Sequence, residues 1–167
     1  GLKWSSKKWS LILLVTLFGS TMYIPEEADA SRFQQNVYDH YLNLSFSQWS
    51  YELYKTLIFS PEPSTKGDVY IHVLSYLVGG VLGLPGIFFT LVAFIFGYFY
   101  INGLFKIFRG GNQIKTTLLF VLLSLIFVIF NGVDSLQTVR TWTGSWVLFN
   151  GVVGFHQTRK KKYLLLM

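Results

Sequence analysis

The feature that most constrains this chain is a stretch from Val69 to Phe105 that contains no charged residue. Its second half, residues 86–105, is apolar and has the roughly 20 residues that a helix needs to cross a bilayer. Its first half, residues 69–84, is interrupted by glycines and leads into a Gly-Leu-Pro-Gly break. We therefore expect a full span over 86–105, preceded by an interfacial or re-entrant helix over 69–84.

The composition also indicates a membrane protein. Of the 167 residues, 51% are hydrophobic and only 13% are charged, whereas a soluble domain averages about 25% charged residues. So few polar residues cannot cover a water-soluble globule, and disorder requires low hydrophobicity together with high charge. The absence of cysteine excludes disulfides, cysteine-ligated metals and cysteine nucleophiles.

Three further apolar runs, at residues 9–24, 116–133 and 141–158, predict additional spans. The first is short and follows three lysines, so a signal-peptide core is its alternative. Aromatic residues at both of its ends favour a span. The expected fold is all-α and polytopic, with four transmembrane helices in a single membrane domain over residues 1–167.

The net charge of +6 is unevenly distributed. Residues 26–68 hold seven acids and three bases, a net charge of −4, whereas the rest holds one acid and eleven bases, a net charge of +10. Because cytoplasmic loops are rich in Lys and Arg, both ends of the chain are predicted to be cytoplasmic and residues 26–68 to lie outside. The bases form short runs beside apolar segments rather than one basic face, which argues against nucleic acid as a partner.

The outer segment 26–68 is predicted to form two short amphipathic helices on the membrane surface, with their aromatic faces toward the lipid. Capping-box patterns at Ser31-x-x-Gln34 and Ser45-x-x-Gln48 precede helical periodicity. Two interpretations remain open: the helices only cover the bundle, or they roof an outward-facing cleft.

Polar residues in or beside apolar segments are candidate functional groups. Asn150 is expected to form a helix–helix hydrogen bond or to serve a function in the last span. His72 is expected to bind a pigment, to shuttle a proton or to anchor its helix at the interface. Since the three histidines are far apart and show no metal-binding spacing, no metal or other cofactor is predicted.

Arg140 is the strongest candidate, because it stands beside Trp142 in a predicted outer loop, where Lys and Arg are disfavoured. A guanidinium binds phosphate or carboxylate in a bidentate manner, and aromatic rings offer faces for sugars or lipid head groups. An ordinary ion pair between Asp134 and Arg140 is the alternative. Further candidates predicted on the same side are Asp29, Arg32, Asp68 and Tyr70.

Together these residues are suited to a cleft for a lipid-linked diphosphate. Arg32 and Arg140 would hold the diphosphate and neutralise the leaving group. Asp29 or Asp68 would deprotonate a sugar hydroxyl as general base, and Tyr70 and Trp142 would line the substrate site.

Five short motifs resemble the N-terminal part of EpsG-like, Wzy-type membrane proteins of bacterial polysaccharide biosynthesis. Their spacing covers nearly the whole chain. In chain order they are Ala28-Asp29-Ala30-Ser31-Arg32, Gly67-Asp68-Val69-Tyr70, Leu74-Ser75-Tyr76-Leu77, Phe96-Gly97-Tyr98-Phe99-Tyr100 and Val139-Arg140-Thr141-Trp142-Thr143.

This resemblance implies a multispanning inner-membrane glycosyltransferase that joins oligosaccharide repeat units carried on undecaprenyl diphosphate, at the periplasmic face. Carried over by position, Arg32 and Arg140 would hold the anionic substrates, with Asp29 and Asp68 as polar partners. Because such polymerases have more spans than this chain, the chain is expected to be an N-terminal portion or a truncated relative. The alternative is a non-catalytic small membrane subunit that packs into a larger membrane complex through lipid or pigment contacts.

Overall fold

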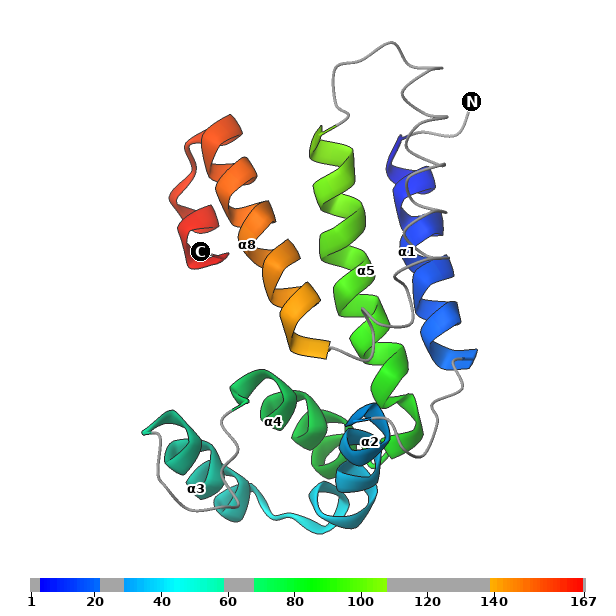
Figure 1. Ribbon diagram of the computed structural model, residues 1–167, viewed down its shortest axis with the longest axis vertical. Helices are drawn as coiled ribbons and strands as arrows, with labels where there is room; N and C mark the ends of the chain where they lie inside the picture. The colour runs from blue at the N-terminus through cyan, green and yellow to red at the C-terminus, as the bar shows by residue number, and fades with distance from the viewer. Residues whose placement is uncertain (1–3, 22–28, 59–67, 108–138, 167) are drawn as a thin grey trace. The chain divides into compact units, whose positions relative to one another are not determined.

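The computed structural model describes residues 4–21, 29–58, 68–107 and 139–166, shown as ribbons in Figure 1. These residues form helices and turns without a strand among them, which confirms the all-α class. The chain divides into two compact units: unit 1 comprises Gly1–Met22 and Thr90–Met167, and unit 2 comprises Tyr23–Phe89. The single membrane domain predicted for residues 1–167 stays a prediction, because compactness alone does not say which residues lie in a membrane.

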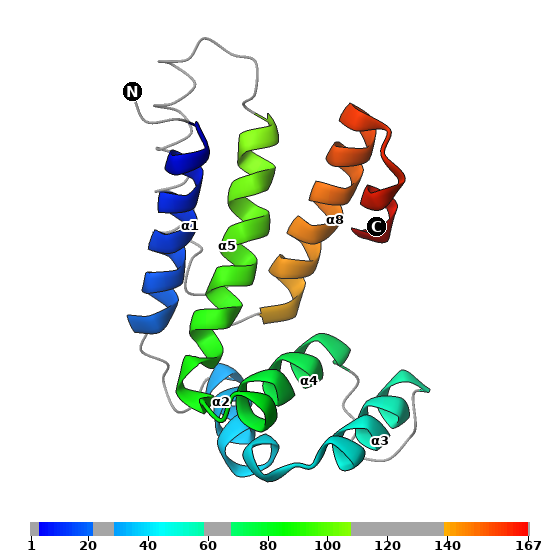
Figure 2. The same ribbon diagram turned by 180° about the vertical axis from the view of Figure 1, so that it is seen from behind.

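Unit 1 is built around α5 (Phe88–Ile107), a helix that begins in unit 2 and belongs to unit 1 from Thr90 onward. Figures 1 and 2 show α5 between α1 (Trp4–Thr21) and α8 (Val139–Thr158), which is followed by the short helix η4 (Lys161–Leu166). Glycines permit the close approach of these helices. A Cβ atom on Gly97 would lie 3.0 Å from Val15 Cγ1 of α1, and one on Gly103 would lie 2.7 Å from Trp146 Cζ3 of α8.

Polar side chains add specific ties between α5 and α8. Asn150, which is 2% exposed, donates from Nδ2 to the backbone oxygen of Phe99 at 2.6 Å. Lys106 Nζ donates in return to the backbone oxygen of Asn150 at 3.0 Å. The helix–helix hydrogen bond is therefore the observed role of Asn150.

Among the described residues, Pro85–Lys106 is the one helical stretch long and apolar enough to cross a membrane. It contains the span predicted at 86–105. The runs predicted at 9–24 and 141–158 do form helices, but α1 includes Lys7 and Lys8 and α8 carries many polar residues, so neither meets that criterion. The span predicted at 116–133 lies outside the described residues.

Unit 2 contains the predicted outer helices. The structure has α2 at Asp29–Asp39 and α3 at Phe46–Leu57, joined through the short helix η1 at Tyr41–Asn43. The capping box at Ser45 is confirmed, since its side chain accepts from the backbone N–H of Gln48 and the Gln48 side chain accepts from the backbone N–H of Ser45. The box predicted at Ser31 is wrong, because α2 already begins at Asp29 and Ser31 lies within its first turn.

The stretch predicted as interfacial or re-entrant is a short helix in unit 2. It comprises α4 (Val69–Tyr76) and a π-helical turn, η2 (Leu77–Val81), and it ends before the 3₁₀ turn η3 (Pro85–Ile87). Gly83 turns the chain with a φ of +64°, which glycine adopts readily. Gly79 lets η2 pack against η1, because a Cβ there would lie 3.0 Å from Tyr41 Cβ and 3.1 Å from the Leu42 amide nitrogen.

The apolar repeats of α2 and α3 are partly used for packing inside unit 2. Val37 of α2 is fully buried, and Trp49 of α3 stacks on Tyr76 of α4 with ring centroids 4.5 Å apart. At these two positions, the helix faces that were predicted to point toward the lipid pack inside unit 2 instead. A different set of apolar side chains is exposed on α3 and just beyond its end: Phe46, Tyr51, Tyr54, Leu57 and Ile58.

Candidate functional site

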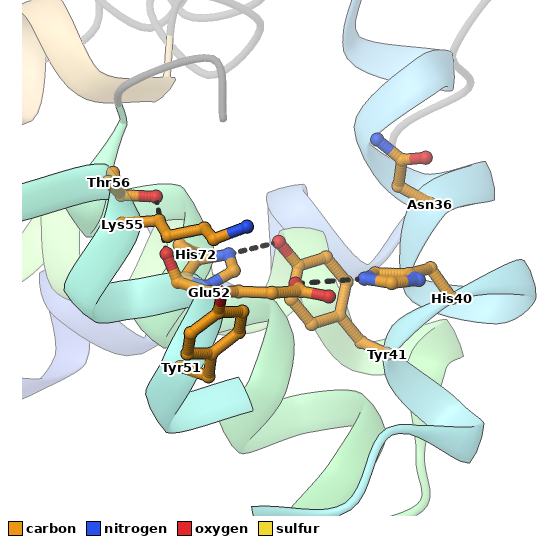
Figure 3. A pocket seen from close by; sticks show the side chains of 8 residues that line it. All are labelled: Asn36, His40, Tyr41, Tyr51, Glu52, Lys55, Thr56 and His72. Carbon is orange, nitrogen blue, oxygen red and sulfur yellow. Dashed lines mark hydrogen bonds and ion pairs between the residues drawn. The ribbon is translucent and has the colours of Figure 1, made fainter. Parts of the chain in front are cut away.

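A pocket of about 450 Å³ in unit 2 brings together polar and aromatic side chains from several of its helices. Figure 3 shows its side chains pointing toward one another from α2, η1, α3 and α4. The size lies within the range of about 300–1,000 Å³ typical of small-molecule sites. We call it the His40–Glu52 pocket; its lining residues are Asn36, His40, Tyr41, Tyr51, Glu52, Lys55, Thr56 and His72.

The first feature of the His40–Glu52 pocket is the pair for which it is named. His40 directly follows α2, and Glu52 lies in the second turn of α3. The two side chains meet at 3.0 Å between His40 Nε2 and Glu52 Oε2 (Figure 3). Both remain partly exposed, at 47% and 32%, so the pair is accessible from the pocket.

The second feature is a buried pair in the pocket wall. The Tyr41 hydroxyl of η1 hydrogen-bonds His72 Nδ1 of α4. Burial raises the pKa of Tyr41 well above its usual value, and the nearby Glu52 carboxylate adds to this shift. The phenol therefore stays neutral at physiological pH, and its hydroxyl and the His72 ring nitrogen share one hydrogen bond.

His72 itself is held in the neutral form. Burial lowers its pKa from the ordinary histidine value, and proximity to His40 acts in the same direction. The Glu52 carboxylate and the Trp49 backbone oppose this shift without cancelling it. His72 is 9% exposed and stacks against Trp49 at a centroid distance of 6.4 Å. Its observed role is thus to anchor α4 to η1 and α3.

The remaining lining residues add a cation and aromatic surface. Lys55 Nζ lies 4.5 Å from the centroid of the Tyr51 ring, within the range of a cation–π interaction. The pocket therefore combines a carboxylate, an ammonium, imidazoles and phenols around one space. Among the described residues no three or more His, Asp or Glu side chains are grouped to hold a metal ion.

Three of the sequence candidates lie in unit 2 with described side chains, and none of them lines the pocket. Asp68 is the N-cap of α4, where Oδ1 accepts from the Ile71 amide at 3.3 Å. Arg32 lies on α2 and Tyr70 on the first turn of α4. The carboxylate of Asp68 is thus already used to begin a helix.

The other three candidates have side chains outside the described residues. Asp29 is the first residue of α2 in unit 2, whereas Arg140 and Trp142 lie in the first turn of α8 in unit 1. Their roles in binding or catalysis stay predictions.

Sequence reasoning missed the His40–Glu52 pair because it searched for histidines in metal-binding motifs. The available signal was the pair of helices joined by a short connection, since such helices bring side chains about a dozen positions apart into contact. His40 and Glu52 flank the connection that contains η1 and the confirmed capping box.

Comparison with known proteins adds no relative: no protein-family model matches the chain, and no curated protein or solved structure is significantly similar to it.

Proposed function

We propose that this chain is an integral membrane protein of bacterial surface-polysaccharide biosynthesis, and that unit 2 receives the glycan part of a lipid-linked substrate. The observation that carries the proposal is the His40–Glu52 pocket. Hydrogen-bonding groups of both kinds and aromatic rings line one space in the segment predicted to lie outside the membrane. Such a lining suits a polyhydroxylated ligand, whose hydroxyls both donate and accept.

The proposal includes a polytopic topology. Residues 9–24, 86–105, 116–133 and 141–158 cross the membrane, both ends are cytoplasmic, and 26–68 faces outward. It is supported by the distribution of Lys and Arg and by the membrane-length helix Pro85–Lys106. A cysteine introduced at position 110 is expected to react only with reagents that reach the cytoplasm. Labelling from the outer face would contradict this topology.

The chemistry proposed is polymerisation of repeat units carried on undecaprenyl diphosphate. Its support is the resemblance of the five motifs to EpsG-like proteins and the character of the residues in them. Arg32 and Arg140 hold the diphosphate, with Asp29 and Asp68 as polar partners. Tyr70 and Trp142 contact the substrate.

The test is polymer formation in cells that carry Arg140→Ala. We expect a loss of about a hundredfold, because a guanidinium that stabilises a developing diphosphate charge is removed. Arg140→Lys is expected to recover only part, since lysine lacks the bidentate fork. Arg159→Gln, at an exposed arginine just after α8, is the matched control and should leave the polymer unchanged.

Membrane fractionation must show each variant inserted at the level of the unmodified protein. Normal polymer with Arg140→Ala would contradict the proposed function. If that variant instead loses a co-purifying membrane protein, the non-catalytic subunit is the better description.

A further inference from the structure

The His40–Glu52 pair is both acid–base capable and open to a ligand, unlike the Tyr41–His72 pair and the Asp68 cap. The Tyr41–His72 pair is buried, and the Asp68 carboxylate caps a helix. By contrast, His40 and Glu52 are held in contact by α2 and α3 while remaining partly exposed in the pocket.

Stability gives no sufficient reason for this pair. Ion pairs between exposed side chains stabilise proteins by about 0–1 kcal/mol, and α3 already begins with a complete capping box. The pair is therefore expected to contribute little to folding, which allows its function to be tested separately.

The chemistry of the two side chains shows which of them donates the hydrogen bond. The Glu52 carboxylate only accepts hydrogen bonds, so His40 Nε2 carries a hydrogen, and in the neutral form of the ring the lone pair is on Nδ1. An imidazole in this state accepts a proton from a hydroxyl, and the carboxylate stabilises the imidazolium that forms. The titratable and charged groups around the pair are Lys55 and Tyr51 of α3, Tyr41 of η1 and His72 of α4.

Resting on the proposed function, we propose that His40 is the general base that deprotonates the acceptor sugar hydroxyl, and that Glu52 is its positioning residue. As the acceptor oxygen bonds to the anomeric carbon of the donor, the bond from that carbon to the diphosphate oxygen breaks. The hydroxyl proton passes to His40 Nδ1, and the bond's electron pair leaves with the lipid diphosphate. The bond formed, the bond broken and the proton transferred account for the whole reaction, so no oxidant, reductant or metal is needed.

This assignment moves the general base from the two carboxylates predicted for that role, Asp29 and Asp68, to the pocket. The Asp68 carboxylate accepts from the Ile71 amide at the start of α4, so protonating or displacing it would weaken the helix end.

The experiment measures polymer formation by membranes that contain the full chain and the host's own undecaprenyl-diphosphate-linked repeat units. His40→Gln is expected to lower the rate about a hundredfold or more, as is usual for loss of a general base. Thermal unfolding should stay unchanged. The matched controls are Asp39→Asn, an exposed carboxylate beside His40 that does not line the pocket, and His156→Gln, an exposed histidine of α8.

A double-mutant cycle separates a positioning role from a structural contact. Glu52→Gln alone should lower the rate about tenfold or more, because the neutral amide stabilises the imidazolium formed in the reaction less. In the His40→Gln background the same substitution should have little further effect, since the base through which it acts is gone. A structural contact would lower the rate by the same factor in both backgrounds.

Two results would overturn the proposal: a rate within about threefold of normal for His40→Gln, or an equal effect of Glu52→Gln in the presence and absence of His40. If His40→Gln fails to accumulate in the membrane, a rate within about threefold of normal for Glu52→Gln would overturn the proposal. If Arg140→Ala abolishes polymer while His40→Gln does not, the base is wrong and the proposed function stands. Normal polymer in both variants would contradict both the assignment of His40 as the base and the proposed function.

Discussion

The two units use polar side chains in opposite ways. In unit 1, Asn150, Lys106 and Gln157 each donate to a backbone carbonyl of a neighbouring helix. In unit 2, His40 pairs with Glu52 and Tyr41 pairs with His72, each side chain to side chain.

The difference teaches which groups are available for chemistry. A side chain that bonds to a backbone carbonyl fixes helix packing and has no partner whose protonation can change. A pair of titratable side chains can exchange a proton, and when it borders a cavity it can exchange one with a ligand. Unit 1 therefore shows the contacts of a helix bundle, and unit 2 shows those of a site.

The largest expected effect tests the packing of unit 1. Gly103→Val should destabilise the protein by about 1–3 kcal/mol, because the added atoms overlap the Trp146 ring of α8. Unfolding in mixed detergent micelles measures this change. Gly144→Ala on α8 is the control, since no atom lies within 4 Å of a Cβ there. Equal effects of the two substitutions would contradict the close approach of α5 and α8.

The next effect tests the buried pair of unit 2. Tyr41→Phe removes the hydroxyl that hydrogen-bonds His72 Nδ1 and should destabilise unit 2 by about 2 kcal/mol, since a buried polar group loses its partner. Hydrogen exchange of α4 amides reports the loss. Tyr54→Phe, at an exposed tyrosine of α3, should show almost none. A neutral Tyr41→Phe would mean that the pair does not hold η1 against α4.

A smaller effect follows from the lowered pKa of His72. The unfolded chain takes up a proton near pH 6.5, whereas the folded protein resists protonation at His72 until lower pH. The stabilising contribution is therefore present above about pH 6.5 and is lost as the pH falls below it. Thermal unfolding between pH 8 and pH 5 (about 1.5 units beyond that pKa on either side) should show this decline.

Replacing His72 with Phe should flatten the decline, because the perturbed group is gone. The same change at His156, which is exposed on α8, should leave it in place. An identical decline in both variants would assign it to other groups.

The smallest effect is expected from removing the hydrogen bond between Asn150 of α8 and Phe99 of α5 in unit 1. Asn150→Leu should destabilise the protein by about 1 kcal/mol, the usual net contribution of one intramolecular hydrogen bond. Asn102→Leu is the control, because its side chain bonds only to Tyr98 of its own helix. Polymer formation should survive Asn150→Leu, and its loss would place this tie within the functional machinery.

Local signals in the sequence predicted much of the fold. The all-α class and the helix over 86–105 followed from apolar length and composition, and the start of α3 followed from the Ser45 capping box. The Ser31 box failed because Asp29 begins α2 two residues earlier, and the same short-range pattern fits a residue inside a helix. Boundaries of this kind depend on competition between neighbouring polar residues.

The candidate site was less predictable. Asp68 caps α4 in the structure, a role that the sequence reading did not assign to it, and its predicted catalytic role stays a prediction. His40 carried no motif, because its partner Glu52 lies on another helix. His72 was recognised as unusual, but its partner Tyr41 is thirty-one positions away. Local sequence patterns do not show which residues far apart in the chain will meet in the fold.

The sequence by itself determined what depends on local composition and spacing: a helical, apolar chain with an acidic segment over residues 26–68 and at least one membrane-length helix. Only the tertiary structure decided which polar residues meet. The approach of η1 to η2 at Gly79 and the stacking of Trp49 on Tyr76 bring α2, α3 and α4 together around one pocket. The physical reason is that hydrophobic periodicity acts within a helix, whereas the pairing of side chains such as His40 and Glu52 depends on how helices pack.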